Sequence, residues 1–140
     1  MLRQHLARLH VTTSGRQLVD VTARVTRELR GSGLTEGVAT LFLRHTSASV
    51  LIQENADPAV LRDLERFFAR LVPDGEPLFE HVDEGPDDMP AHVRAALTAT
   101  QLAVPFSGGA LLLGTWQAVY LYEHRHAPHT RELVVHLLGE

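Results

Sequence analysis

Cysteine and lysine are both absent from the 140 residues of this chain. The lack of cysteine excludes disulfide bonds, thiolate-ligated zinc or iron–sulfur clusters and a thiol nucleophile. The lack of lysine excludes a side-chain Schiff base and a P-loop lysine, so arginine supplies all 13 formal positive charges. The 17 acidic residues bring the net charge to −4, which argues against a general nucleic-acid binder.

Long apolar segments are missing as well. The uninterrupted apolar runs are far too short to span a bilayer, and residues 1–5 contain no signal-peptide core. We therefore expect a cytoplasmic protein that has neither a membrane nor a nucleic acid among its partners. The chain is 44% hydrophobic, and at this length one domain over residues 1–140 can bury roughly two-thirds of its unfolded surface.

The spacing of apolar residues and the local turn chemistry predict three helices, over residues 21–30, 58–72 and 89–97. Asp57 is a suitable N-cap for the second helix, and Pro58 suits its first position. We expect the apolar stripe of this helix to face the core; it consists of Val60, Leu61, Leu64, Phe67, Phe68 and Leu71.

Short β-prone runs fill most of the remaining chain, at residues 4–13, 17–21, 38–43, 49–53, 101–106, 110–113, 118–123 and 133–138. We expect one hairpin between the third and fourth of these strands and another at Ser107-Gly108-Gly109. Hairpin connections imply antiparallel pairing, so the sequence predicts an α+β domain rather than a doubly wound parallel sheet. No glycine-rich phosphate-binding motif follows any strand.

The stretch from His81 to His92 is the richest in chemistry. Two histidines flank a loop that carries four carboxylates, and Asp88 precedes His92 by one helical turn, which places both on one face. Imidazole and carboxylate groups together predict a metal or acid–base site. The alternative is a solvated acidic loop with capping aspartates; we favour the functional interpretation because His92 enters the helix close to its inner face.

Two further polar segments lie near the predicted strand ends. His45 is followed by hydroxyl residues that include Ser47 and Ser49, which could supply a ligand or base together with donors for an anion. An ordinary turn explains this segment equally well. Glu54 and Asn55 lie beside the N-terminus of the second helix, whose partial positive charge favours anions.

The last two candidates combine stacking and phosphate recognition. Thr115, Trp116 and Gln117 could hold a heteroaromatic ring, although a single tryptophan more often belongs to a core or an interface. Arg125 and Arg131 follow a strand that ends at Glu123, and arginine recognises phosphate with two parallel hydrogen bonds. The competing interpretation is a charged strand end.

Five motifs in this order resemble the YjbQ family, and the likeness covers nearly the whole chain. They are His45-Thr46-Ser47-Ala48-Ser49, Glu54-Asn55-Ala56-Asp57-Pro58, the segment from Asp83 to His92, Gly114-Thr115-Trp116-Gln117 and Glu123-His124-Arg125. The resemblance implies an α+β domain whose mostly antiparallel strands form a β-sandwich, assembled as a homotrimer. It also implies a weak or secondary thiamine-phosphate synthase activity, which joins hydroxymethylpyrimidine pyrophosphate to thiazole phosphate and releases pyrophosphate.

The same resemblance suggests roles for individual residues. We expect His45, His81 and His92 to bind one divalent metal, zinc as the first choice and magnesium as the second. The predicted catalytic carboxylates are Glu54, Asp88 and Glu123. The predicted substrate-binding residues are Ser47, Ser49, Asn55, Thr115, Trp116, Gln117, Arg125 and Arg131.

Two other functions stay open beside the synthase. One is a metal-dependent hydrolase or lyase that acts on a small phosphorylated metabolite, since three neutral ligands leave a coordination position open. The other is a non-catalytic trimer that binds a metal or a metabolite. Metal content followed by turnover assays separates the enzymes from the binding protein.

Overall fold

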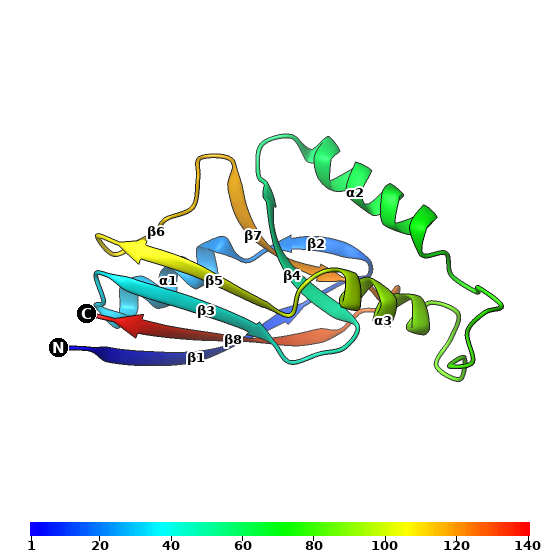
Figure 1. The fold of residues 1–140 in the computed structure, drawn as a ribbon, viewed down its shortest axis with the longest axis horizontal. Coiled ribbons are helices and arrows are strands. Elements are labelled where there is room, and N and C mark those ends of the chain that lie inside the picture. Colours follow the sequence, from blue (N-terminus) through cyan, green and yellow to red (C-terminus); the bar gives the residue numbers. More distant parts are fainter.

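Two antiparallel sheets form the body of the protein in the computed structural model, which describes residues 1–140 (Figure 1). One sheet has the order β1-β8-β3-β5-β6 and the other the order β2-β7-β4. The strands are β1 (Arg3–Thr12), β2 (Gln17–Asp20), β3 (Gly37–Leu43), β4 (Ala48–Glu54), β5 (Gln101–Ser107), β6 (Ala110–Leu111), β7 (Gln117–Glu123) and β8 (Thr130–Gly139). The predicted α+β fold with mostly antiparallel sheets is confirmed.

The core lies between the two sheets because alternate residues along each strand turn inward. On β8, Leu133, Val135 and Leu137 are fully buried, and they belong to the same cluster as Val119 and Leu121 of β7. Helix α1 (Thr22–Ser32) adds further buried side chains to this cluster. A single cluster of 17 buried residues therefore joins both sheets and one helix.

The helix boundaries follow the local signals. Helix α1 ends at Gly33, whose φ of 72° is the left-handed conformation that glycine adopts without strain. Helix α2 (Pro58–Leu71) is capped by Asp57, whose Oδ1 accepts a hydrogen bond of 2.9 Å from the backbone N–H of Ala59. The third helix is α3 (Asp88–Leu97). None of the three has the length and hydropathy that a bilayer-spanning helix needs.

One predicted hairpin is confirmed and the other is wrong. The turn at residues 107–109 joins β5 to β6, which pair through Phe106 and Leu111. In contrast, β3 and β4 do not pair: β3 lies between β8 and β5, and β4 pairs with β7 in the other sheet. Residues 44–47 therefore carry the chain from one sheet to the other. Both strands are apolar enough to be buried, and proximity in sequence did not determine their partners.

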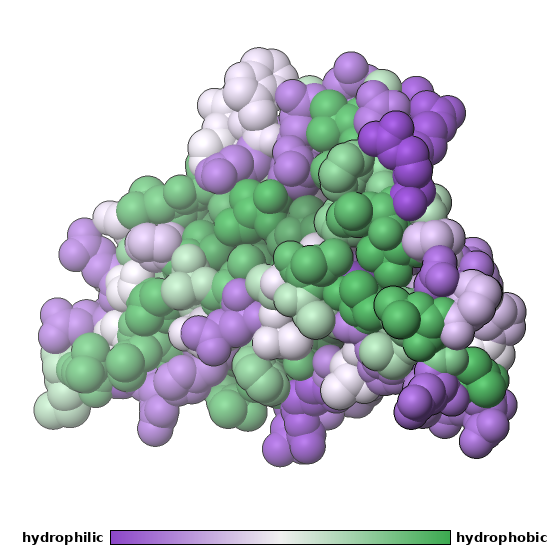
Figure 2. Space-filling model, turned by 45° about the vertical axis from the view of Figure 1, so that its right-hand side comes forward, coloured by the Kyte–Doolittle hydropathy of each residue, from purple (hydrophilic) through white to green (hydrophobic).

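Helix α2 does not join the core, which corrects the expectation for its apolar stripe. It lies outside the sheet β2-β7-β4, and none of its residues is buried (Figure 1). Phe67 and Leu71 are 49% and 54% exposed. The helix is fastened to β7 mainly through Phe68, whose ring meets that of Tyr122 edge-on, and through Glu65, which accepts a hydrogen bond of 2.8 Å from the Tyr122 hydroxyl. Figure 2 shows apolar residues gathered in a band across this side of the molecule.

Candidate metal centre

The loop between α2 and α3 is fastened at both ends by arginines. Arg16 pairs with Asp74 near its start, with 2.7 Å between Nη2 and Oδ1, and Arg125 holds its end. Arg125, just after β7, donates from Nε to Asp87 at 3.0 Å, and its two terminal nitrogens donate to Asp88 at 2.8 Å and to the carbonyl of Glu84 at 2.9 Å. These charge-assisted hydrogen bonds are stronger than neutral ones. They fix the start of α3, and with it the direction of the Asp88 carboxylate.

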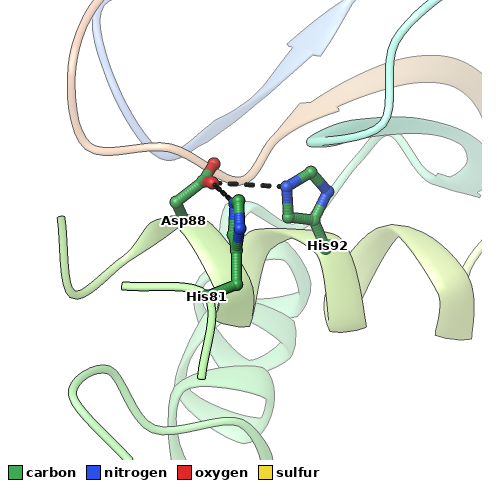
Figure 3. Close-up of side chains that lie close together, drawn as sticks. All are labelled: His81, Asp88 and His92. Carbon is green, nitrogen blue, oxygen red and sulfur yellow. Dashed lines mark hydrogen bonds and ion pairs between the residues drawn. The ribbon is translucent and has the colours of Figure 1, made fainter. Parts of the chain in front are cut away.

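Asp88 meets two imidazoles at this point (Figure 3). Its Oδ2 lies 2.7 Å from Nε2 of His81 and 3.3 Å from Nε2 of His92. The Asp88 side chain is only 2% exposed, whereas that of His81 is 50% exposed. The three potential ligand atoms lie within 4.8 Å of one another. The cluster is therefore anchored on its inner side and open to solvent on its outer side.

The orientation of His92 leaves a lone pair directed at the carboxylate. Its Nδ1 lies 2.9 Å from the backbone carbonyl of Thr46, which can only accept, so the hydrogen-bond partners assign the proton to Nδ1. In the neutral ring, Nε2 then carries a lone pair that faces Asp88 Oδ2 at 3.3 Å. Two lone pairs at this distance repel each other unless a proton or a metal cation lies between them.

The two distances from Asp88 to the imidazoles also suit a metal ion. Zinc bonds of about 2.1 Å in a tetrahedral arrangement separate the ligand atoms by roughly 3.4 Å. The spacing of 3.3 Å between His92 and Asp88 already fits, and the 2.7 Å contact of His81 needs to widen slightly. A backbone carbonyl that fixes the tautomer of a ligating histidine is typical of metal sites.

The charge state of Asp88 favours a cation. Burial opposes ionisation of this carboxyl, but the hydrogen bond from His81 and the charge of Arg125 outweigh burial, so the pKa of Asp88 lies below its ordinary value. Its Oδ1 is occupied by Arg125, which leaves Oδ2 for the cluster. Asp88 therefore presents one anionic oxygen to the space between the two imidazoles.

His45 is not part of this cluster. Its Nε2 accepts a hydrogen bond of 2.8 Å from the backbone N–H of Glu132, and its Nδ1 lies 3.3 Å from the guanidinium of Arg131. Burial, followed by the charge of Arg131, lowers the pKa of His45. Both ring nitrogens face β8, so the chain brings together two of the three predicted histidines and completes the group with Asp88.

Glu123 and Arg131 form a fully buried ion pair with each other. Glu123 accepts hydrogen bonds from Arg131 Nε at 2.8 Å and from the Thr13 hydroxyl at 2.7 Å, and a second guanidinium nitrogen of Arg131 contacts its other oxygen. The same guanidinium donates to the Ser47 hydroxyl at 3.0 Å. Burial raises the pKa of Glu123, but these donors reverse that effect and hold the pKa below its ordinary value. Glu123, Arg131 and Ser47 thus have structural partners in the protein.

A neighbouring set of buried polar residues combines Ser49, a predicted substrate-binding residue, with His124 and Arg94, to which the sequence analysis assigned no role. His124 is fully buried beside Ser49, with Nε2 2.9 Å from the serine hydroxyl, and burial together with the charge of Arg94 lowers its pKa to about 3. Arg94 is also fully buried and donates to Glu65 of α2 at 2.7 Å. No sequence signal indicated that Arg94 would lie among the buried residues of α3.

The remaining predicted residues lie at the far end of β4 and β7. The register pairs Ala48 with Glu123 at one end and Glu54 with Gln117 at the other, so about 3.3 Å per residue separates the two ends by about 20 Å. At the far end, Asn55 donates from Nδ2 to the carbonyl of Thr115 at 3.1 Å, and Trp116 is largely exposed. Within one chain, these residues do not approach the histidine cluster.

Comparison with known proteins gives the same family throughout. The family model described as "UPF0047 protein YjbQ-like" matches residues 7–140. A UPF0047 protein of Synechocystis sp. is 51% identical over 138 residues, which cover 99% of this chain and 94% of that protein. The UPF0047 protein YjbQ of Escherichia coli O157:H7 is 45% identical over 104 residues, covering 74% of this chain and 75% of that protein.

Solved structures agree with the fold. An uncharacterised protein of the YjbQ/UPF0047 family from Clostridium acetobutylicum is 32% identical, with a TM-score of 0.86 over 94% of this chain and 98% of that one. A YbjQ-like protein of unknown function from Sulfolobus solfataricus is 24% identical, with a TM-score of 0.91 over 100% of both chains, and shows the fold alone. These matches define the class as a small α+β domain built on two antiparallel sheets. The chain belongs to the UPF0047 (YjbQ-like) family.

Proposed function

We propose that the chain is a metal-dependent enzyme in which His81, Asp88 and His92 hold one divalent cation and act on a small phosphorylated metabolite. The observation that carries this proposal is the placement of His92, whose Nε2 faces Asp88 Oδ2 at 3.3 Å while its Nδ1 faces the carbonyl of Thr46. Two imidazoles in the ligand set favour zinc over magnesium, which prefers oxygen ligands. Three protein ligands leave a coordination position for a phosphate oxygen or water.

The protein residues around the cluster have separate tasks. Thr46 and Arg125 hold His92 and Asp88 in orientation, and the half-exposed His81 faces incoming ligands. A bound divalent cation supplies a Lewis acid that polarises a phosphoryl oxygen. The guanidinium groups of Arg125 and Arg131 are already engaged by carboxylates, so in this proposal the cation, and not arginine, binds the substrate phosphate.

The thiamine-phosphate synthase reaction is one reaction that such a centre can serve, because a cation stabilises a pyrophosphate leaving group. Trp116, the predicted stacking surface, lies at the other end of β4 and β7. A pyrimidine stacked on Trp116 would therefore require the cluster of a second copy. We keep the synthase among the reactions to assay and place phosphate-ester hydrolysis first.

The homotrimer is part of the same proposal. The apolar stripe of α2 is partly exposed, and Trp116 is exposed as well, so each copy has apolar surface that other copies can cover. Sedimentation of the purified protein should therefore show a trimer at micromolar concentration. A stable monomer under these conditions would contradict this part of the proposal and leave the metal centre untouched.

Metal stoichiometry tests the centre directly. We expect about one zinc per chain in the unaltered protein and in His136→Ala, and less than half of that in His92→Ala after identical purification. His136 is a matched control because its Nε2 bonds Gln4 across β1 and β8, remote from the cluster. Equal metal in both variants would remove His92 from the site.

Turnover then separates an enzyme from a binding protein. The zinc-loaded protein is assayed with phosphate monoesters, and with hydroxymethylpyrimidine pyrophosphate plus thiazole phosphate. We expect release of phosphate from a monoester that is lost in His92→Ala and kept in His136→Ala. Bound metal with no turnover of either substrate class would favour a metal-binding protein without catalysis.

A further inference from the structure

A pocket lies inside the loop that leads from α2 to α3, directly beside His81. Its volume is about 340 Å³, and all of its lining residues come from residues 75–90. We call it the loop pocket. This volume is at the small end of ligand-binding pockets, so it suits one ring or a short chain rather than a nucleotide or a polymer.

The loop pocket is held open by its own backbone. Three of its lining residues are prolines, whose φ is fixed. The loop is closed where the backbone N–H of Gly75 donates to the carbonyl of Pro86 at 3.1 Å. Arg125 fastens the segment that follows, through Asp87 and Asp88. A pocket fixed in this way does not have to form when a ligand arrives, which lowers the entropic cost of binding.

The walls favour a flat apolar group. Phe79, Met89 and the three prolines supply aromatic, thioether and rigid aliphatic surface. Such surfaces gain free energy when they stack on a ring and exclude water from it. Glu76 and His81 are the ionisable residues of the lining, and the carboxylate of Glu76 disfavours any anionic group inside.

His81 connects the loop pocket to the metal centre. The same imidazole lines the pocket and directs Nε2 at Asp88 from 2.7 Å (Figure 3). A ligand can therefore place its ring in the pocket and its anionic group on the cation, provided that only a few bonds separate the two. An anion without a ring can reach the cation but gains nothing from the pocket.

We propose that the loop pocket binds a planar, apolar ring and so selects aromatic phosphates over aliphatic ones at the His81–Asp88–His92 centre. This inference rests on the proposed function for the position of the phosphate. Phe79 and Met89 are the residues that determine specificity, and they do so by contact with the ring.

A methionine label tests occupancy of the pocket without any metal. The chain has two methionines; Met89 lines the pocket and Met1 is 98% exposed, so the second is an internal control. In chelator-treated protein labelled with ¹³C-methyl methionine, phenol should shift the Met89 methyl signal by the ring current and leave the Met1 signal in place. No shift of Met89, or equal shifts of both signals, would overturn the proposal. A Met89 shift that depends on protein concentration without phenol would also overturn it, because a second copy would then occupy the pocket.

A pair of non-hydrolysable anions tests selectivity in zinc-loaded protein. Phenylphosphonate should bind on the order of tenfold more tightly than methylphosphonate, which corresponds to about 1.4 kcal/mol. Phe79→Ala should bring the two dissociation constants close together, while Leu78→Ala, whose side chain is exposed outside the pocket, should preserve the ratio. Equal affinities of the unaltered protein for the two phosphonates would overturn the proposed ring binding by the loop pocket, even if zinc binds. Failure to bind zinc would overturn the proposed function. The phenol titration would still decide whether the loop pocket binds a ring.

Discussion

Two clusters of acidic and basic side chains lie at the same end of β4 and β7, and they differ in how completely each oxygen is satisfied. In the buried one, both carboxylate oxygens of Glu123 accept hydrogen bonds from Arg131, and Thr13 adds a further donor. In the other, Asp88 directs one oxygen at His81 and His92 on a side open to solvent. Saturated, buried pairs hold a fold together, whereas an anionic oxygen that faces two imidazoles on a solvent-open side is suited to bind a ligand.

The largest effect is expected when the saturated cluster loses its acid. Glu123→Ala leaves the guanidinium of Arg131 buried without a counter-charge, which should lower the free energy of unfolding by about 3–5 kcal/mol. Urea denaturation measures the change. The matched control is Glu132→Ala, since Glu132 is the neighbour of Arg131 and pairs with Arg44 near the surface, where an ion pair contributes about 0–1 kcal/mol. If both variants lose the same stability, the buried Glu123–Arg131 pair contributes no more to the fold than a surface ion pair does.

A smaller effect is expected from pH, through the buried His124. Its pKa is about 3 in the folded protein against an ordinary value of 6.5, so below pH 6.5 the unfolded chain binds a proton that the folded one does not. Stability contributed by the neutral ring is therefore complete above pH 6.5 and is lost as the pH falls toward 3, at about 1.4 kcal/mol per pH unit.

Denaturation at pH 7 and pH 5 tests this slope. The unaltered protein should be less stable at pH 5 by about 2 kcal/mol, and His124→Gln should reduce that difference. His10→Gln removes an exposed imidazole on β1 and should preserve the difference in stability between pH 7 and pH 5. A slope that is identical in all three proteins would place the pH sensitivity elsewhere.

The smallest change in intrinsic stability is expected at the open cluster. His81→Ala in chelator-treated protein should alter the free energy of unfolding by no more than about 0.5 kcal/mol, because the side chain is half exposed. Zinc should raise the melting temperature of the unaltered protein, because binding stabilises the folded state by about 2.7 kcal/mol at a zinc concentration 100 times the dissociation constant. The variant should lose most of that response. A large loss of stability without metal would show that His81 is a structural residue.

Helix α2 shows how far the sequence predicts the fold. Asp57, Pro58 and the apolar stripe are local signals, and they placed the helix and its cap correctly. The stripe also suggested a core position, yet the helix lies outside the sheet with no buried residue. Amphipathicity indicates which side of a helix is apolar, but the surface that covers this side is determined by tertiary structure.

The two polar clusters show the same limit for the site. Asp88 and His92 are one turn apart on one helix, so their proximity follows from the sequence. His45 is separated from α3 by one strand and one helix, and it is the backbone carbonyl of Thr46, not the His45 imidazole, that reaches His92. The pairing of Glu123 with Arg131 depends on burial between the sheets. A pattern of residue types cannot distinguish such a pair from a charged strand end.

The position of β8 has a consequence for folding of the chain. This strand, the last in sequence, lies between β1 and β3 and hydrogen-bonds to both. At about 5–20 residues per second, synthesis from the end of β3 to the end of β8 takes several seconds. During this time β1 has no partner, and β3 can pair with β5 on one edge only. Pairing of segments so distant in sequence is slow, and unpaired strand edges tend to aggregate. The nascent chain is therefore most vulnerable to aggregation until its final strand is available, and removal of residues 130–139 should prevent folding rather than trim an edge.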